Sequence, residues 1–218
     1  YVNSEKIEPS NYKKTLKNSD AILVPGGFGN RGIEGMILAV RFARENKIPF
    51  FGICLGLQIA IIEMTRNLLN LKDANSTEFK PRTKNKVISL VTEWKNKDGT
   101  IEKRNKNSDK GGSMRLGAQK ASLLTGSLAR NLYKMKTIFE RHRHRYEVNP
   151  EYIPMLEKEG LIVSARSEAH NLVEMIELRN HPWFLGCQFH PEFTSKPKTG
   201  HPLFNNFIKT AVKLKKKK

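Results

Sequence analysis

The stretch Ile48–Ala60, IPFFGICLGLQIA, decides the fold that we predict for this chain. It begins with an apolar run that ends at Gly52, and apolar residues recur at helical spacing after Gly56. Cys54 stands between the two glycines, so the stretch predicts a strand, a sharp turn and a helix with a cysteine at the turn. Glycines suit this elbow because a Cβ there would crowd the neighbouring strand and helix.

Cys54 has two interpretations. A small cysteine buried in a strand-to-helix turn is one of them, and a reactive thiol is the other. The positive field at a helix N-terminus favours the thiolate, which is the nucleophilic form of cysteine. The flanking glycines and the strand–helix context favour the nucleophile.

A second strand and a glycine-rich loop precede the elbow. Asp20–Val24 is a short apolar strand, Pro25–Gly32 (PGGFGNRG) is the loop, and a helix follows from about Glu34. Strand, loop, helix, strand and elbow helix form a βαβα unit. We therefore predict an α/β fold with a mostly parallel central sheet flanked by helices.

The loop itself is open to two interpretations. Gly27–Gly32 fits the G-x-G-x-x-G pattern of a dinucleotide-binding loop. That class of protein needs an acid at the end of the next strand to hold a ribose, and Gly52-Ile53-Cys54 supplies none. Backbone N–H groups of Gly26 and Gly27 can instead form an oxyanion hole, since no side chain blocks a developing O⁻. We favour the oxyanion loop.

The composition limits the class of protein. With 218 residues, 38% of them hydrophobic, the chain can bury the core of one large domain. No apolar run is long enough to cross a membrane, and no signal-peptide pattern is present. Cys54 and Cys187 are too few for a disulfide framework, which predicts a reducing, cytoplasmic location. Cys187 lies among large apolar neighbours and is expected to be an inert core thiol.

The formal net charge of +18 raises a third class, a basic nucleic-acid or scaffold module. Much of the charge comes from Lys80–Lys110 and from the tail Lys213–Lys218. Neither segment interleaves aromatic residues at base-stacking spacing, so we expect solvated segments and no nucleic-acid partner. Without a C-x-x-C or H-x-x-x-H pair, we also expect no metal site.

The remaining elements follow from local patterns. Three stretches carry specific expectations: a hairpin with its turn at Lys97–Thr100, a flexible lid at Gly111–Gly117, and one strand over Ile138–Val148. In that strand the arginines share one face and the histidines the other. Further strands are expected at 87–91, 161–166, 172–178 and 183–189, and helices at 150–159 and 203–214. We expect residues 1–19 to be a lead-in from an absent N-terminal domain, 20–212 the α/β domain, and 213–218 a disordered basic tail.

A thiolate nucleophile needs a base, and the base needs a group that orients it. We choose His190 among the six histidines because it stands at the carboxyl end of a buried strand, where α/β sites gather. Glu192, two residues on, is close enough to orient the imidazole. We therefore predict a triad of Cys54, His190 and Glu192.

These motifs resemble class I (triad-type) glutamine amidotransferases, through Gly52–Gln58, Pro25–Gly29 and His190-Pro191-Glu192. The resemblance covers about residues 20 to 212 and implies a flavodoxin-like architecture. Other stretches are similar, more narrowly, to the C-terminal glutaminase domains of the CTP synthase family. They are Asn75–Phe79, Gly111–Gly117, Glu140–Val148 and Cys187–Ser195.

The resemblance implies that the chain hydrolyses L-glutamine to glutamate and ammonia through a thioester on Cys54. Backbone N–H groups of Gly27 and Leu55 would hold the oxyanion. A carboxylate suits the α-ammonium of glutamine, and an arginine fork suits its α-carboxylate. The residues carried over as substrate-binding are Gly27, Leu55, Gly56, Leu57, Gln58, Glu78 and Arg145.

The resemblance also implies partners outside this chain. An N-terminal synthase domain of the same polypeptide would use the ammonia to aminate UTP to CTP with ATP and Mg²⁺, in a homotetramer activated by GTP. No cofactor is implied within this domain. Arg31, Arg104 and Arg115 are assigned to the GTP site or to the lid beside the ammonia route.

Overall fold

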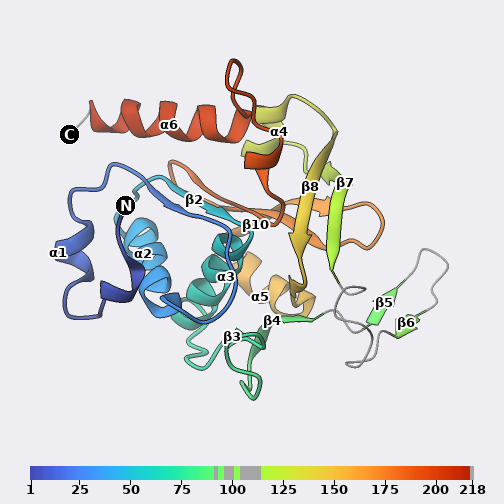
Figure 1. The fold of residues 1–218 in the computed structure, drawn as a ribbon, viewed down its shortest axis with the longest axis horizontal. Coiled ribbons are helices and arrows are strands. Elements are labelled where there is room, and N and C mark those ends of the chain that lie inside the picture. The colour runs from blue at the N-terminus through green and yellow to red at the C-terminus, as the bar shows by residue number, and fades with distance from the viewer. Residues whose placement is uncertain (91–92, 96–100, 104–113, 217–218) are drawn as a thin grey trace.

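The computed structural model describes residues 1–90, 93–95, 101–103 and 114–216. A curled sheet of seven strands forms its centre, with helices on both faces (Figure 1). The strands, in order across the sheet, are β1 (Ile22–Val24), β2 (Phe50–Ile53), β12 (Phe184–Cys187), β11 (Val173–Leu178), β10 (Leu161–Ser167), β7 (Arg115–Leu123) and β8 (Thr137–His144).

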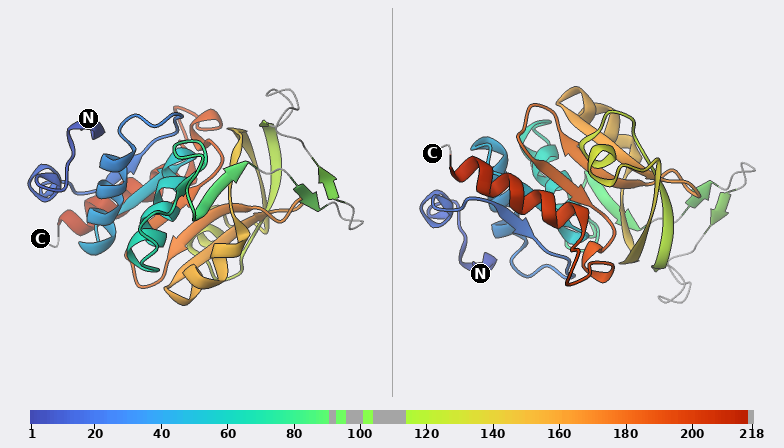
Figure 2. Two further views of the ribbon diagram at one scale, coloured as in Figure 1. Left: turned by 90° about the horizontal axis from the view of Figure 1, so that it is seen from below. Right: turned by 90° about the horizontal axis from the view of Figure 1, so that it is seen from above.

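Two smaller sheets lie beside the central one. One contains β3 (Asn75–Ser76), β4 (Lys86–Leu90) and β9 (Tyr146–Val148). The other is a hairpin of β5 (Glu93–Lys95) and β6 (Ile101–Lys103), which projects away from the rest of the molecule (Figure 2). The expected hairpin is confirmed by this antiparallel pair, whereas its turn lies outside the described residues.

The helices divide between the two faces of the central sheet. On one face lie α2 (Ile33–Glu45), α3 (Leu55–Asn67) and α5 (Ile153–Lys158), and on the other lie α4 (Leu128–Tyr133) and α6 (Pro202–Lys215). Short helical turns are η1 (Ser4–Lys6), α1 (Tyr12–Leu16), η2 (Pro150–Tyr152) and η3 (Pro191–Phe193). None of the helices in the described part of the chain is long and apolar enough to cross a membrane.

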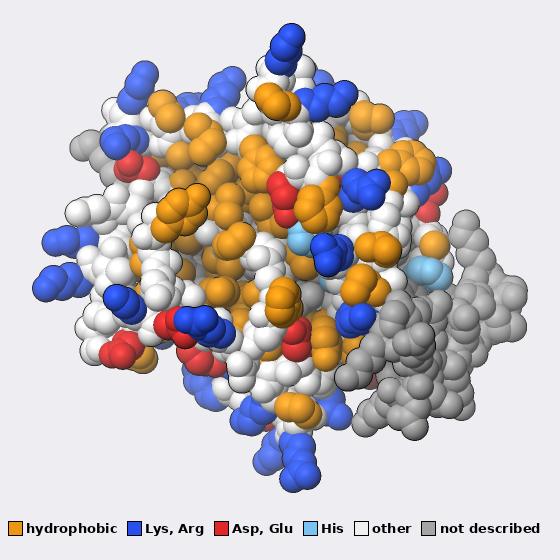
Figure 3. Space-filling view, viewed as in Figure 1, with side chains coloured by type: hydrophobic (Ala, Val, Ile, Leu, Met, Phe, Trp, Pro, Cys, Tyr) orange, Lys and Arg blue, Asp and Glu red, His pale blue; other side chains and the backbone are white. Residues whose placement is uncertain are grey.

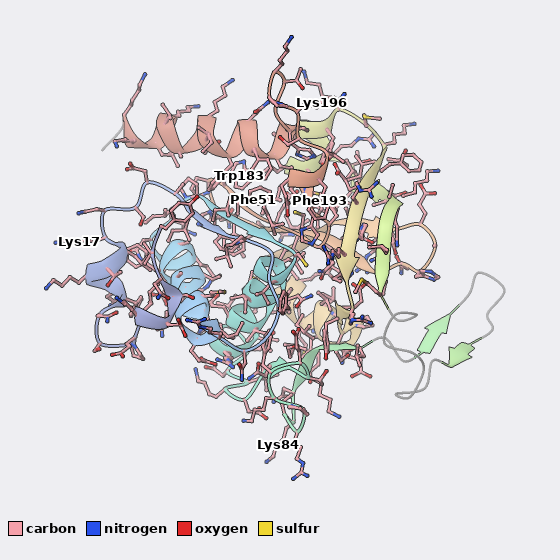
Figure 4. The ribbon with its side chains drawn as sticks, in the orientation of Figure 1. Lys17, Phe51, Lys84, Trp183, Phe193 and Lys196 are labelled. Carbon is pink, nitrogen blue, oxygen red and sulfur yellow. The ribbon has the colours of Figure 1, made fainter. Side chains whose placement is uncertain are left out.

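Strand β2 is buried along its whole length because both faces of the sheet are covered. Phe50 belongs to the core on the α2–α3 side, where its ring lies 4.6 Å from that of Phe184. Phe51 belongs to the core under α6, and its ring lies 5.5 Å from that of Trp183 (Figure 4). This two-sided burial explains why the strand appears in the sequence as a continuous apolar run.

The α/β class with flanking helices is confirmed, but the expectation of a mostly parallel sheet is wrong. Within the central sheet, only the pairs β1–β2 and β2–β12 are parallel. The other four pairs of the central sheet are antiparallel. Short loops join β10 to β11 and β11 to β12, and a parallel pair would need a long crossover connection in those places.

The segment 1–19 packs against α2. Ile7, Tyr12 and Leu16 are buried in the core on the α2–α3 side. The rings of Tyr12 and Phe42 of α2 meet edge to face, with their centres 6.3 Å apart. The backbone oxygen of Ser4 lies so close to Gly35 of α2 that a Cβ at Gly35 would stand 1.9 Å from it.

Three local expectations are corrected. Residues 115–117 are not part of a lid but the start of β7, which pairs with β8, while residues 111–113 lie outside the described chain. The strand expected over 138–148 breaks at Arg145 into β8 and β9, so Arg145 does not continue the face of Arg141 and Arg143. Helix α4, which begins with a Ser127 side-chain cap, is an element that the sequence pattern does not predict.

Candidate active site

Cys54 occupies a strained turn between β2 and α3. Its φ of 52° and ψ of −100° are unusual for a residue other than glycine. The flanking glycines leave no room for side chains, since a Cβ at Gly52 would stand 2.6 Å from the backbone of Gly56. A Cβ at Gly56 would in turn stand 2.3 Å from the backbone oxygen of Val24 in β1. The predicted elbow is therefore confirmed, and tight packing of strand on helix is its cause.

His190 lies beside this cysteine and is held by a carboxylate. Its Nδ1 is 2.6 Å from Glu192 Oε1, and its ring stacks on Phe193 with centres 4.7 Å apart. A Cβ at Gly26 would stand 2.7 Å from His190 Cε1 and 3.6 Å from Cys54 Cβ, so the glycine loop, the cysteine and the histidine meet at one point. His190 Nε2 is buried and has no hydrogen-bond partner among the described residues.

The electrostatics of His190 follow from these neighbours. Burial lowers the pKa of His190, but Cys54 and Glu192 outweigh burial and raise the pKa from 6.5 to about 9. The imidazole is therefore protonated at neutral pH, and the side chain can give a proton to a group bound at Cys54. The Cys187 thiol is fully buried, and burial raises its pKa, so it is an inert core thiol as expected.

Gly27 and Leu55, the residues expected to form an oxyanion hole with their backbone N–H groups, lie next to each other. Leu55 is the first residue of α3, where an N–H has no partner within the helix. A Cβ at Gly27 would stand 3.0 Å from Leu55 Cδ2, so the two residues are neighbours. This arrangement fits donors directed at a developing negative charge.

The substrate-binding candidates lie around Tyr146. Glu78 Oε1 accepts a 2.7 Å hydrogen bond from the Gly29 N–H, which ties it to the glycine loop. Glu78 also raises and Arg145 lowers the pKa of Tyr146, whose largest shift comes from burial. Gln58 Nε2 donates to the backbone oxygen of Tyr146 at 3.0 Å.

Gly56 and Leu57 contribute differently. Gly56 packs against β1, and the side chain of Leu57 is fully buried in the core. Any contact of these residues with a ligand therefore comes from the backbone.

Of the three arginines assigned to GTP or to a lid, the structure describes Arg31 and Arg115, and these two make separate ion pairs. Arg31 is exposed and makes a two-pronged ion pair with Glu5, at 2.7 and 2.8 Å. Arg115 is buried and lies 3.1 Å from Glu147 and 2.6 Å from Glu174, so the lid assignment of Arg115 is wrong. Arg104 lies outside the described residues.

Arg115 belongs to a buried polar cluster next to the candidate site. Burial raises the pKa of Glu174 to about 7. Burial and the charge of Arg115 lower the pKa of His142 to about 2, so this histidine is neutral. His144 Nε2 lies 2.7 Å from Glu147 Oε1 across the break at Arg145. No group of three metal-ligating side chains occurs among the described residues.

Sequence reasoning missed two residues at the site. Gln188 is fully buried, and its Nε2 lies 3.7 Å from Cys54 Sγ. Phe193 stacks on His190 although its side chain is half exposed. The only available signal was their position, within three residues of His190 after a buried strand.

A cysteine on a strained strand-to-helix turn, beside a histidine held by a glutamate, is the arrangement expected of a triad-type α/β enzyme with a cysteine nucleophile. A family model described as glutamine amidotransferase class-I matches residues 2–210. The chain belongs to this family.

Two solved structures are informative. The chain is 40% identical to the glutaminase domain of Trypanosoma brucei CTP synthase with bound acivicin, with a TM-score of 0.87, and the match covers 98% of this chain and 80% of that one. A putative GMP synthase protein from Thermoplasma acidophilum matches 99% of this chain and 81% of its own length, with 16% identity and a TM-score of 0.59. The second likeness shows the fold alone.

Proposed function

We propose that this chain is the glutaminase unit of a CTP synthase and hydrolyses L-glutamine to glutamate and ammonia. The observation that carries the proposal is Cys54 on its strained elbow against the His190–Glu192 pair. The 40% identity to a CTP synthase glutaminase domain, which holds acivicin, supports the choice of substrate.

In the proposed mechanism, the Cys54 thiolate attacks the side-chain amide carbon of glutamine. The N–H groups of Gly27 and Leu55 stabilise the negative oxygen of the tetrahedral intermediate. Protonated His190 then gives its Nε2 proton to the departing ammonia, and a γ-glutamyl thioester remains on Cys54. Neutral His190 next takes a proton from water, which attacks the thioester and releases glutamate.

The ends of the substrate would be recognised by charge. Arg145 suits the α-carboxylate, while Glu78, together with the side-chain oxygen of Gln58, suits the α-ammonium. Gln58 uses only Nε2 for its bonds to Tyr146 and Gln188, and these bonds do not involve its side-chain oxygen. Glu78 is tied to the glycine loop, so substrate and oxyanion donors would be aligned by the same loop.

The ammonia would be used by a synthase domain that aminates UTP to CTP with ATP and Mg²⁺, in a cytoplasmic homotetramer activated by GTP. The Mg²⁺, like the ATP and UTP, would belong to that domain. On the face drawn in Figure 3, basic side chains are spread widely and do not gather in one patch. This face therefore offers no continuous basic surface of the kind that binds a nucleic acid.

Substitution of Arg145→Ala is expected to raise the KM for L-glutamine by roughly ten- to hundredfold, since hydrogen bonds to charged groups contribute about 1.5–3 kcal/mol. Release of glutamate from L-glutamine measures this effect and also tests the proposed reaction. Arg141→Ala is the matched control, because Arg141 is exposed on β8. An equal rise of KM in both variants would argue against a specific role, and no glutamate release from the wild-type chain would refute the function.

The pH dependence should depend on Glu192. His190 loses its proton as the pH rises through about 9, so kcat/KM is expected to fall there as the acid for ammonia departure is lost. Glu192→Gln removes one of the contributions that raise the pKa of His190, so the fall should move to lower pH. A pH profile of glutamate release by both proteins measures the shift. An unmoved alkaline limb in the variant is the contrary result.

A further inference from the structure

Gln188 lies directly against the candidate nucleophile. It follows β12, its side chain is fully buried, and its Nε2 is 3.7 Å from Cys54 Sγ. The backbone N–H of Gln188 donates to the backbone oxygen of Glu174 at 2.8 Å, which fixes Gln188 to β11. A buried amide held in this way has little freedom to turn away from the sulfur.

The orientation of the Gln188 amide follows from a chain of hydrogen bonds. The backbone oxygen of Tyr146 can only accept, so Gln58 must present its Nε2 there, at 3.0 Å. The same Nε2 has a second hydrogen, which goes to Gln188 Oε1 at 3.3 Å. Gln188 must therefore present its own Nε2 to Cys54, and the chain fixes this direction independently of the sulfur.

An N–H donor stabilises a thiolate more than a neutral thiol, and more strongly in a buried site than in water. The donor also favours the sulfur as a leaving group, since the thiolate forms again when water displaces it from the thioester. His190 approaches from the loop after β12, and Gln188 adds a donor that does not titrate. The sulfur therefore accepts from one permanent donor, Gln188 Nε2, and the ionisable His190 lies nearby.

We propose that Gln188 is a further catalytic residue, whose Nε2–H holds Cys54 as the thiolate through a bond oriented by Gln58 and Tyr146. The proposal rests on Cys54 being the nucleophile of the proposed function. It assigns a chemical task to a buried amide that would otherwise be only part of the core.

Alkylation of Cys54 by iodoacetamide tests this proposal without using the glutamine site. The rate is measured from about pH 5 to pH 10 with mapping of the adduct by mass spectrometry, because only the thiolate reacts. In Gln188→Met, the midpoint of the rate profile should rise by about one to two pH units. Gln188→Leu, a second apolar variant that adds no charge, should raise it as well, because its side chain cannot donate to the sulfur.

The controls separate this effect from general damage. Gln119→Met removes an amide that bonds Arg115 instead of Cys54, and its midpoint should not move. Two titratable groups interact with Cys54, namely His190 and Cys187, and both are unchanged in every variant. Glu192, which bonds His190, is unchanged as well. Near-ultraviolet circular dichroism identifies variants that keep the native core.

A natively folded Gln188 variant with an unmoved midpoint would overturn the proposal. If Gln188→Met does not fold, Gln188→Leu decides in the same way. The experiment also distinguishes failure of the proposed glutaminase function from failure of the role proposed for Gln188. If the midpoint shifts but the wild-type chain releases no glutamate, the role of Gln188 is supported and the glutaminase function is refuted. If the wild-type chain releases glutamate but the midpoint does not shift, the glutaminase function is supported and the role of Gln188 is refuted.

Discussion

Replacing Cys54 with alanine should reduce glutamate release by at least about ten-thousandfold, because removing a covalent nucleophile leaves only binding and the oxyanion donors. The fold should survive, since Cys54 is 4% exposed and the lost sulfur faces the site as well as the core. Alanine also retains a Cβ, so the positive φ at this position is no more strained than in the wild type. Single-turnover and steady-state assays of glutamate, with circular dichroism, measure both effects.

Cys187→Ala is the matched control for this prediction. Cys187 is fully buried, and its Sγ donates to the Phe189 oxygen at 3.5 Å, so the substitution tests the loss of a core thiol alone. We expect lower stability with turnover largely retained in the folded protein. Normal turnover in Cys54→Ala would refute the mechanism.

Replacing Arg115 with methionine should lower the free energy of unfolding by about 3–5 kcal/mol, the usual cost of leaving buried partners of an ion pair uncompensated. Arg115 lies against Glu147 and Glu174, and all three side chains are buried. Its charge lowers the pKa of both carboxyl groups, although burial raises each of them. Without Arg115, both values rise in the folded state.

The sign of the pH dependence follows. A carboxyl group whose folded pKa is raised contributes stability below its unfolded pKa and loses that contribution as the pH rises through the folded pKa. Glu174, whose pKa is already about 7, would move further in that direction. The pKa of Glu147 lies below its usual value, so its rise would remove stability that Glu147 contributes at higher pH. The loss in Arg115→Met should therefore be larger near pH 8 than near pH 5, as measured by urea unfolding.

Arg31→Met is the control for Arg115, because the Arg31–Glu5 pair is exposed. It should have little effect on urea unfolding. Adding Glu174→Gln to Arg115→Met should recover part of the lost stability, since the buried Glu174 carboxylate, left without its arginine, is then removed. Equal losses in the two arginine variants would contradict the role of the buried cluster.

The sequence predicted well those features that depend on local pattern. The elbow, the glycine loop, and the pairing of His190 with Glu192 were found because tight packing requires glycine and because Glu192 is near His190 in the chain. The expectation of mostly parallel neighbours was wrong, since β11 and β7 run against the other strands of the central sheet, although the short loops after β10 and β11 carried part of that information.

Features that depend on distant packing could not be predicted. Arg115 lies in a polar, glycine-rich stretch typical of a loop, yet pairing with β8 and two distant glutamates bury it. Gln188 contacts Cys54 from 134 positions away, and nothing in its neighbours indicates an amide directed at sulfur. At Arg145 the chain changes from pairing with β7 to pairing with β4, which alternation alone does not show.

The central claim is that Cys54 is the nucleophile of a glutamine site. Mass spectrometry after incubation with acivicin, a glutamine-like electrophile, tests it most directly. We expect one adduct per chain, mapped to Cys54 and prevented by excess L-glutamine. An adduct on Cys187 or on surface lysines, or labelling of Cys54 that L-glutamine does not slow, would contradict the claim.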